Sequence, residues 1–273
     1  MGSLVYHRDL IAERGPKMLL RRVIEHVRKQ EWTAVAIDFV IVVVGVFVGI
    51  QAANWNEARA DASRARGYLE RIHADLGADL ANYEDKIRFW NAVSRYGRAG
   101  LTYADTGRTP DRTQWELLLA YFQASQVAEF WTRSTTYDEL KSAGELNLIA
   151  NLDLRNALAR YYTESGNPAL TERPAYREHV RGVIPIEVQL YIWGRCYASN
   201  AQGEQSIRDC ASPISEAAAT AIVNRIRRDP ALMSELRYWM STMRVASMIG
   251  RDRTNFAKEV LASVSAELGH EGD

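Results

Sequence analysis

The segment from Thr33 to Ala53, TAVAIDFVIVVVGVFVGIQAA, constrains the fold more than any other part of this sequence. Its residues from Phe39 to Ile50 form an unbroken apolar run. In a helix that rises 1.5 Å per residue, about 20 residues cross the roughly 30 Å hydrocarbon core of a bilayer. The many β-branched residues would also suit a buried strand, but a strand of this length without a turn signal would be unusual. We therefore predict a transmembrane helix at residues 33–53.

The surroundings of this segment indicate an uncleaved anchor. Trp32 and Trp55 flank it, and tryptophan is enriched where a spanning helix meets the membrane–water interface. The competing interpretation is a cleaved signal peptide, whose apolar region normally begins nearer the N-terminus and is followed by a small-residue cleavage site. Here more than thirty residues come first, and the following sequence NWNE at 54–57 is no obvious cleavage site.

Charge on the two sides of the segment predicts its orientation. The preceding residues include the bases Arg14, Lys17, Arg21, Arg22, Arg28 and Lys29. The residues that follow carry Arg59, Arg64, Arg66 and Arg71, interleaved with acids. Because basic residues favour the cytoplasmic side, we predict a cytoplasmic segment at 1–32 and a domain at 54–273 in the periplasm of a bacterium, anchored in the inner membrane. Residues 18–31 have the pattern of a basic amphipathic helix, so we expect headgroup contacts from Arg21, Arg22, Arg28 and Lys29.

The chain has two cysteines, Cys196 and Cys210, which is too few for a zinc site made of thiolates. They bracket a polar loop between two helical patterns. One interpretation is a disulfide, formed in an oxidising compartment, that closes a loop of about 15 residues and stabilises the fold by about 3 kcal/mol. The other is a pair of unrelated buried thiols, since free cysteine is often buried. We predict the disulfide, because it agrees with the orientation inferred from charge.

Apolar residues at spacings of three and four predict an all-α fold after the membrane segment. They begin with a long helix from Leu69 past Tyr96, continuous with the span, that Gly97, Gly100 and then residues 105–110 would end. Further helices are predicted from near Asp111, as two short helices within 136–162, at 175–195 with a kink at Pro185, at 213–228 and at 230–268. No alternating strand pattern is visible. We expect one soluble bundle of five to seven helices, with the last helix antiparallel to the first.

The segment TYDELKSAGELNLI at 136–149 is the most patterned part of this domain. Thr135 or Thr136 is suited to cap a helix, and Glu139 follows Thr136 at the spacing of a capping box. Gly144 is suited to end that helix in a left-handed turn. We therefore interpret the segment as a packed helix–turn–helix and not as a ligand site.

Two stretches, WTAVAIDFVIVVVGVFVGIQAANWNE and STTYDELKSAGELNLIANLDLRNALARYY, resemble an uncharacterised bacterial family of single-span membrane proteins. That family has a hydrophobic anchor with an N-W-N-E-like boundary and a downstream segment followed by a helix ending in paired tyrosines. The two stretches cover about a fifth of the chain, and neither is a catalytic signature. The resemblance implies a single-span topology and a helical fold, and it implies no activity. The cysteine loop is not part of the family pattern.

The sequence carries no signature of catalysis, metal binding or a cofactor. None of the five histidines has the H-E-x-x-H spacing, and the chain lacks a nucleophile elbow, a P-loop and the G-x-G-x-x-G fingerprint. Acidic pairs such as Glu70 with Asp75 and Glu84 with Asp85 have the spacing of solvated helix faces. The 34 basic and 34 acidic residues cancel, which argues against a nucleic-acid partner. We expect a non-enzymatic protein without a cofactor or a metal site.

Three residues of the predicted span suit contact with another helix. Asp38 is a carboxylate within an apolar segment, where a charge is costly and suggests a partner helix, a proton or a basic group of a neighbouring subunit. It also lies six residues past Trp32, about 9 Å along a helix, so it could equally reach the cytoplasmic headgroups beside Arg28 or Lys29. Gly45 and Gly49 form a pair that lets helices approach closely, on a face similar to that of Asp38.

These features favour one function over two others. The leading hypothesis is a non-enzymatic, membrane-anchored accessory or scaffolding protein whose periplasmic domain docks on a larger membrane complex. Its partners would be membrane lipid and other membrane protein subunits, or a second copy of the chain. The alternative is a periplasmic sensory or ligand-binding bundle. It would signal through a separate protein, because the predicted cytoplasmic segment is short. An unrecognised enzyme is the third possibility.

Overall fold

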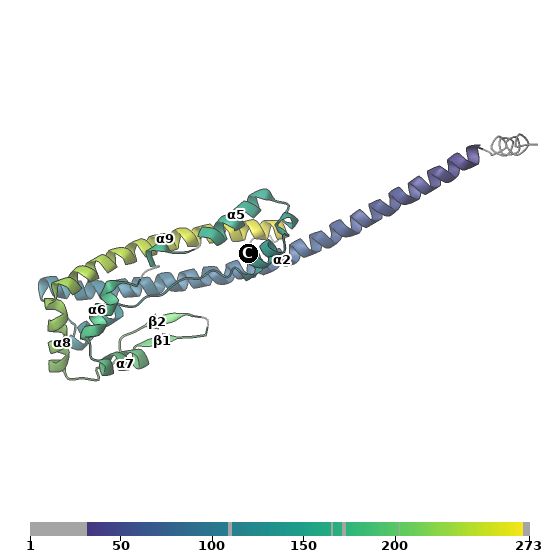
Figure 1. Cartoon of the computed structure of the whole chain (residues 1–273). Helices are drawn as coiled ribbons and strands as arrows, with labels where there is room; N and C mark the ends of the chain where they lie inside the picture. The colour runs from purple at the N-terminus through teal and green to yellow at the C-terminus, as the bar shows by residue number, and fades with distance from the viewer. Residues whose placement is uncertain (1–31, 109–110, 165, 171–172, 202, 270–273) are drawn as a thin grey trace, which may run out of the picture. The chain divides into compact units, whose positions relative to one another are not determined.

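The computed structural model describes residues 32–108, 111–164, 166–170, 173–201 and 203–269 (Figure 1). Arg21, Arg22, Arg28 and Lys29, with the amphipathic helix predicted around them, lie outside the described residues. The chain divides into two units, Met1–Asp61 and Ala62–Asp273. The regular secondary structure of the described residues is helical, as predicted, apart from one short hairpin. The elements are α2 (Trp32–Thr106), α3 (Gln114–Gln123), α4 (Thr135–Ser142), η1 (Leu146–Leu148), α5 (Leu152–Glu164), η2 (Pro168–Leu170), α6 (Ala175–Val183), α7 (Ile186–Arg195), β1 (Tyr197–Ser199), β2 (Gln205–Ile207), α8 (Glu216–Arg228) and α9 (Pro230–Leu268), where η1 and η2 are 3-10 helices.

The described part of the first unit is the beginning of α2, from Trp32 to Asp61. No proline interrupts this helix. The large apolar side chains between Trp32 and Trp55 are all exposed, and an apolar window of this helix is long enough to cross a membrane. The core helix of a soluble protein would instead bury most of such a window. By length, composition and exposure, the stretch of α2 at 33–53 is thus a candidate membrane span, at the position predicted from the sequence.

Gly97 and Gly100 lie inside α2 and do not end it, which corrects the prediction. A Cβ atom on Gly100 would lie 2.7 Å from Cε1 of Tyr121, and one on Gly97 would collide with Met240. These glycines therefore serve close helix packing, a role that spacing along one helix does not reveal. The helix ends at Thr106, within the predicted range, where Gly107 has a positive φ of 65°.

α9 packs antiparallel to the part of α2 that follows Ala62 (Figure 1). Met240, early in α9, lies against Gly97, late in α2. Ser265, near the end of α9, has its Oγ 3.0 Å from Nε2 of His73, much earlier in α2. The predicted pairing of the last helix with the first is thus observed, and α9 begins at the predicted residue, Pro230.

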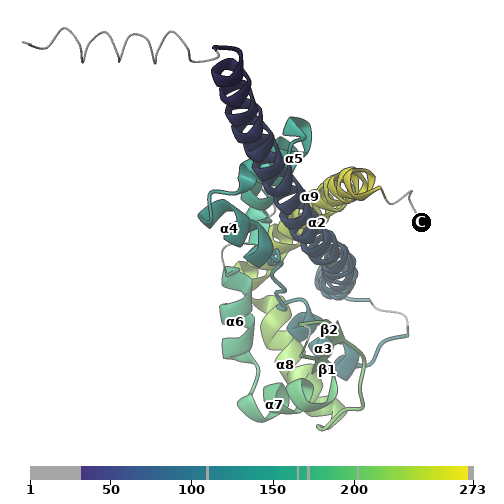
Figure 2. The same cartoon turned by 90° about the vertical axis from the view of Figure 1, so that its right-hand side faces the viewer.

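Two apolar cores lie along this helix pair. The first core forms where α3, α6, α7 and α8 pack against the last turns of α2 and the first half of α9 (Figure 2). The second core forms where α4 and α5 pack against α2 near Leu76 and against the end of α9. Large fully buried side chains of the first core are Trp90, Leu118, Phe122 and Tyr176. Those of the second are Ile72, Leu76, Tyr83, Leu140 and Tyr161.

Pro185 separates two helices where one kinked helix was predicted. α6 ends at Val183, Ile184 has an extended ψ of 128°, and Pro185 takes the N-cap position of α7. A proline disfavours the helical conformation in the residue before it and has no N–H to donate, so the chain leaves the helix here.

The region after Ser134 folds as the predicted helix–turn–helix, but without the predicted cap. The N-terminus of α4 has no side-chain capping bond. Thr136 Oγ1 instead donates to Asp75 Oδ2 at 2.6 Å, and Glu139 pairs with Arg71 at 2.7 Å. Both contacts join α4 to α2, so Asp75 is engaged in packing and not on a solvated face. Gly144 has the predicted left-handed conformation, with a φ of 72°.

The cysteine loop contains a hairpin that the sequence did not predict. β1 pairs antiparallel with β2, and Tyr197 lies opposite Ile207. Each strand has three residues, which is too few for the alternating pattern that marks a strand. Cys196 and Cys210 form a disulfide at the base of this hairpin, with their Cα atoms 5.4 Å apart. The predicted disulfide is therefore confirmed.

Candidate functional site

The residues predicted to contact another helix lie exposed on α2. Asp38, Gly45 and Gly49 are all on the surface, and a Cβ atom on either glycine would have no neighbour within 4 Å. Trp32 and Trp55, the predicted interface residues, are also exposed. All five residues are therefore open to lipid or to a partner helix. The helix-docking role of the first three and the interface role of the two tryptophans stay predictions.

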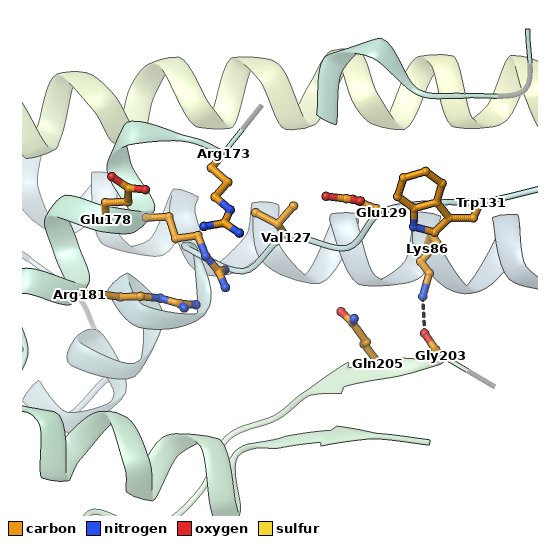
Figure 3. A pocket seen from close by; sticks show the side chains of 10 residues that line it. Lys86, Val127, Glu129, Trp131, Arg173, Glu178, Arg181, Gly203 and Gln205 are labelled. Carbon is orange, nitrogen blue, oxygen red and sulfur yellow. Dashed lines mark hydrogen bonds between the residues drawn. The ribbon is translucent and has the colours of Figure 1, made fainter. Parts of the chain in front are cut away.

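A second feature, which the sequence did not reveal, is a cavity in the unit Ala62–Asp273 that we call the basic pocket. Its volume is about 710 Å³, and its walls come from α2, the chain around the start of α6, the segment after α3, and the cysteine hairpin (Figure 3). Its charged lining residues are Lys86, Glu129, Arg173, Arg177, Glu178 and Arg181. Trp131 and Val127 add apolar surface.

Three arginines at a spacing of four line one side of the basic pocket. Arg173 lies just before α6, and Arg177 and Arg181 lie on it. Side chains four residues apart on a helix share a face, so α6 directs Arg177 and Arg181 to the same side. The guanidinium groups of Arg173 and Arg181 point into the same space (Figure 3).

Neutral groups hold two of these guanidinium groups in place. Arg177 Nη1 donates to the carbonyl of Ser125 at 2.7 Å, and Arg181 Nε donates to Oγ of the same serine at 3.0 Å. Arg181 Nη2 also donates to Gln126 Oε1 at 3.2 Å. The Arg181 group further lies about 5 Å from two aromatic ring centroids, those of Phe122 and Trp193. The two arginines therefore converge on Ser125 with fixed geometry.

Within the described residues, no close carboxylate balances the positive charge of these arginines. Among the described residues, no acid lies within ion-pair distance of Arg173, Arg177 or Arg181, whereas Arg71 pairs with an acid on another helix. Burial, with the charge of Arg177 beside it, lowers the pKa of Arg181 to about 10. Burial and the neighbouring Arg173 likewise lower the pKa of Arg177. Both groups remain protonated at neutral pH, so the pocket keeps an unbalanced positive charge.

The opposite wall is the hairpin, which Lys86 of α2 holds. Lys86 is buried, and its Nζ donates to the carbonyl of Gly203 at 2.5 Å (Figure 3). The same Nζ lies 3.6 Å from Oδ2 of Asp85, so the charge of Lys86 is offset within the fold. Asp85 is thus a partner of a buried lysine, where the sequence predicted a solvated face.

The disulfide closes the base of the same hairpin, and hydrogen bonds from α3 hold both cysteines. Trp115 Nε1 donates to the carbonyl of Cys210 at 2.7 Å. Gln123 Nε2 donates to the carbonyl of Cys196 at 3.0 Å. Because β2 supplies Gln205 to the pocket lining, the disulfide supports one wall of the basic pocket.

A buried carboxylate, Asp79, lies in the second apolar core. It is 1% exposed and accepts hydrogen bonds from the hydroxyl of Tyr161 at 2.8 Å and from the backbone N–H of Arg133 at 3.1 Å. Burial raises the pKa of Asp79 above its usual value, against the lowering effect of these two bonds. The donors belong to α5 and the segment before α4, so Asp79 joins these parts to α2. We assign it a structural role.

The structure and the comparisons add no sign of a metal centre or of a known family. Within the described residues, no group of three or more His, Cys, Asp or Glu side chains is placed to hold a metal ion. No family model, curated protein or solved structure matches the chain. The family resemblance of the two stretches therefore stays a prediction, and the function rests on the geometry above.

One signal in the sequence could have indicated the basic pocket. Arg173, Arg177 and Arg181 recur at the spacing of one helix face, in a segment that was predicted to be helical. The spacing alone also fits a solvated face. Only the structure shows that Ser125, a residue about 50 positions earlier, holds two of these side chains toward a cavity.

Proposed function

We propose that this chain is a non-enzymatic, single-span membrane protein that serves as an accessory or scaffolding subunit of a larger membrane complex. Its N-terminus would lie in the cytoplasm of a bacterium, and its helical domain would dock on other subunits in the periplasm. The observation that carries the proposal is the exposure of every large apolar side chain of α2 between Trp32 and Trp55.

The free-energy cost of apolar side chains in water requires that lipid or protein surrounds this part of α2. Leaving a Val, Ile or Phe side chain in water costs about 1.5–3 kcal/mol relative to burial, and here more than ten such side chains are exposed in succession. A lipid bilayer covers them over the right length. At 100° per residue, Asp38, Gly45 and Gly49 fall within a narrow arc of the helix, which suits close contact with a partner helix.

Two independent features support the proposed orientation. Basic residues are more numerous before the span than directly after it, which favours a cytoplasmic N-terminus. The Cys196–Cys210 disulfide lies after the span, and disulfides persist in oxidising compartments such as the periplasm.

Purification from gently solubilised bacterial membranes tests the docking function. We expect the full chain to migrate as a species larger than the monomer and to bring partner subunits or a second copy with it. Replacing Gly45 and Gly49 by leucine should reduce that association, because the added side chains prevent close helix approach. The matched control, Val40→Leu with Val43→Leu, places the same two leucines on the opposite face and should leave the association unchanged. Migration of the wild-type chain solely as a monomer would contradict the proposal.

The basic pocket favours a second function, a ligand-binding domain that signals through a separate partner. Its volume of about 710 Å³ lies in the range of small-molecule sites, and fixed polar groups face it. A thermal-shift screen of the full chain against small metabolites tests this function. A ligand that binds the folded state raises its apparent stability by mass action, so the melting temperature should rise with ligand concentration.

A further inference from the structure

We infer that the basic pocket binds an organic anion, a phosphate monoester or a carboxylate that also carries an aromatic or apolar group. This inference rests on the second function proposed above, ligand binding by the helical domain, and names the chemical class of the ligand. Three features of the pocket support it: its guanidinium N–H donors, its positive charge, and the apolar surface at its other side.

The donors of the pocket match the geometry of an oxyanion. A guanidinium group has five N–H donors in a planar fork, which binds carboxylate and phosphate oxygens in pairs. The hydrogen bonds to Ser125 and Gln126 use one N–H of Arg177 and two of Arg181. Both side chains line the cavity and are already fixed by these bonds, so little conformational entropy is lost when they bind a ligand.

The charge of the pocket favours an anion over a neutral ligand. Arg177 and Arg181 are half-buried beside each other with neutral acceptors only. Burial disfavours the charged form of both side chains and lowers the pKa of each; repulsion by Arg173 adds to this effect at Arg177, and repulsion by Arg177 adds to it at Arg181. A bound anion would offset both the cost of burying these charges and the repulsion between neighbouring arginines.

The far side of the cavity is suited to an uncharged, apolar group. Trp131 is 73% exposed, and it lines the pocket on the side away from Arg173 (Figure 3). Glu129 lies between them, and its carboxylate would repel a second negative charge at this side. A ligand with an anionic group at one end and a ring at the other would contact the arginines with the first and Trp131 with the second. The cavity is also much larger than an inorganic phosphate ion requires.

Four simple probes test separately whether binding needs the anionic group and whether it needs the ring. The full chain in neutral detergent is titrated with phenyl phosphate, benzoate, inorganic phosphate and phenol, and binding is measured by thermal shift and calorimetry. We expect phenyl phosphate or benzoate to bind most tightly, inorganic phosphate to bind more weakly because it lacks the ring, and phenol to leave the melting temperature unchanged. The first two probes also distinguish a phosphate ligand from a carboxylate ligand.

Substitutions assign the binding to this pocket. Arg177→Gln and Arg181→Gln should each raise the dissociation constant of the bound anion about tenfold or more, the size expected for a charge-assisted hydrogen bond. Trp131→Ala should raise it about three- to tenfold, as expected for one aromatic contact. The matched control Arg251→Gln removes an exposed arginine of α9 that does not line the pocket, and it should bind as the wild type does.

The outcomes distinguish this inference from the functions proposed above. If neither phenyl phosphate nor benzoate binds the wild-type chain, or if Arg177→Gln binds them unchanged, the inference is wrong. If only neutral or cationic metabolites shift the melting temperature, ligand binding survives and the anionic class does not. If no metabolite shifts it, both fail, while docking on a membrane complex is unaffected. Should Arg181→Gln not fold, the probe series and the exposed Trp131 still decide the question.

Discussion

Replacing Gly250 by alanine should destabilise the helix pair α2–α9, although alanine is the better helix former. The added Cβ atom would lie 2.7 Å from Cζ3 of Trp90 and 3.2 Å from Cγ1 of Ile87. Trp90 is fully buried, and its indole N–H donates to the carbonyl of Ala128 at 2.9 Å, so its ring is not free to move away. Overpacking of this kind costs about 1–3 kcal/mol, and we expect the upper end here. After the gain of about 1 kcal/mol from helix propensity, the net loss is about 2 kcal/mol.

The assay is thermal unfolding of the full chain in mild detergent, followed by circular dichroism. For a domain of this size, 2 kcal/mol corresponds to a fall of about 4–8 °C in Tm. Gly77→Ala is the matched control, because Gly77 is exposed on α2 and its new Cβ would have no neighbour within 4 Å. That control should raise Tm slightly. In a Trp90→Phe background, which replaces the indole by a smaller ring without the colliding Cζ3 atom, Gly250→Ala should lose most of its cost. If Gly250→Ala and Gly77→Ala raise Tm equally above that of the wild type, α2 and α9 do not make this close contact at Gly250.

Three further predictions concern the disulfide, a buried acid and a helix cap. Replacing Cys196 and Cys210 by serine should remove about 3 kcal/mol of stability, or about 6–12 °C in Tm, and a reducing agent should lower the Tm of the wild type but not of the variant. Asp79 has a raised pKa, so its folded form holds a proton more tightly than the unfolded form does. The contribution of protonated Asp79 to the stability of the fold is therefore present at low pH. It is lost as the pH rises from about 4 through the pKa of the folded form. The Tm of the wild type relative to Asp79→Asn should fall over that range, and a rise would contradict the assignment. Thr113 accepts from the N–H of Glu116 in a capping box at the start of α3, so Thr113→Ala should lower Tm by about 2–4 °C in the same assay.

Features that depend on neighbours in the sequence were predicted well. The apolar run at 33–53 determines a helix of spanning length, since each residue adds the same rise wherever the helix is placed. Pro230 and the apolar spacing after it place the start of α9, because a helix start is a local property of the backbone. The disulfide joins residues that are 14 apart, and a short polar loop already brings them near each other.

Local predictions were wrong where a distant residue provides the partner. Thr136 was expected to cap its own helix, and it instead donates to Asp75, 61 positions earlier. Gly97 was expected to end α2, and it instead makes room for Met240. The local preferences of threonine and glycine are worth about 1 kcal/mol each, and tertiary contacts of similar or larger size override them.

The sequence by itself thus determined an exposed apolar helix, a helical domain and a disulfide, because each follows from composition and spacing over a short stretch of chain. The tertiary structure alone decided that Arg177 and Arg181 converge on Ser125, that Lys86 is buried beneath the hairpin, and that Asp79 is enclosed in a core. These features arise from the packing of α2, α6 and the segment after α3, which are far apart in the chain. The charge of a side chain can be read from its letter, but its burial and its partners are set by which helices lie beside it.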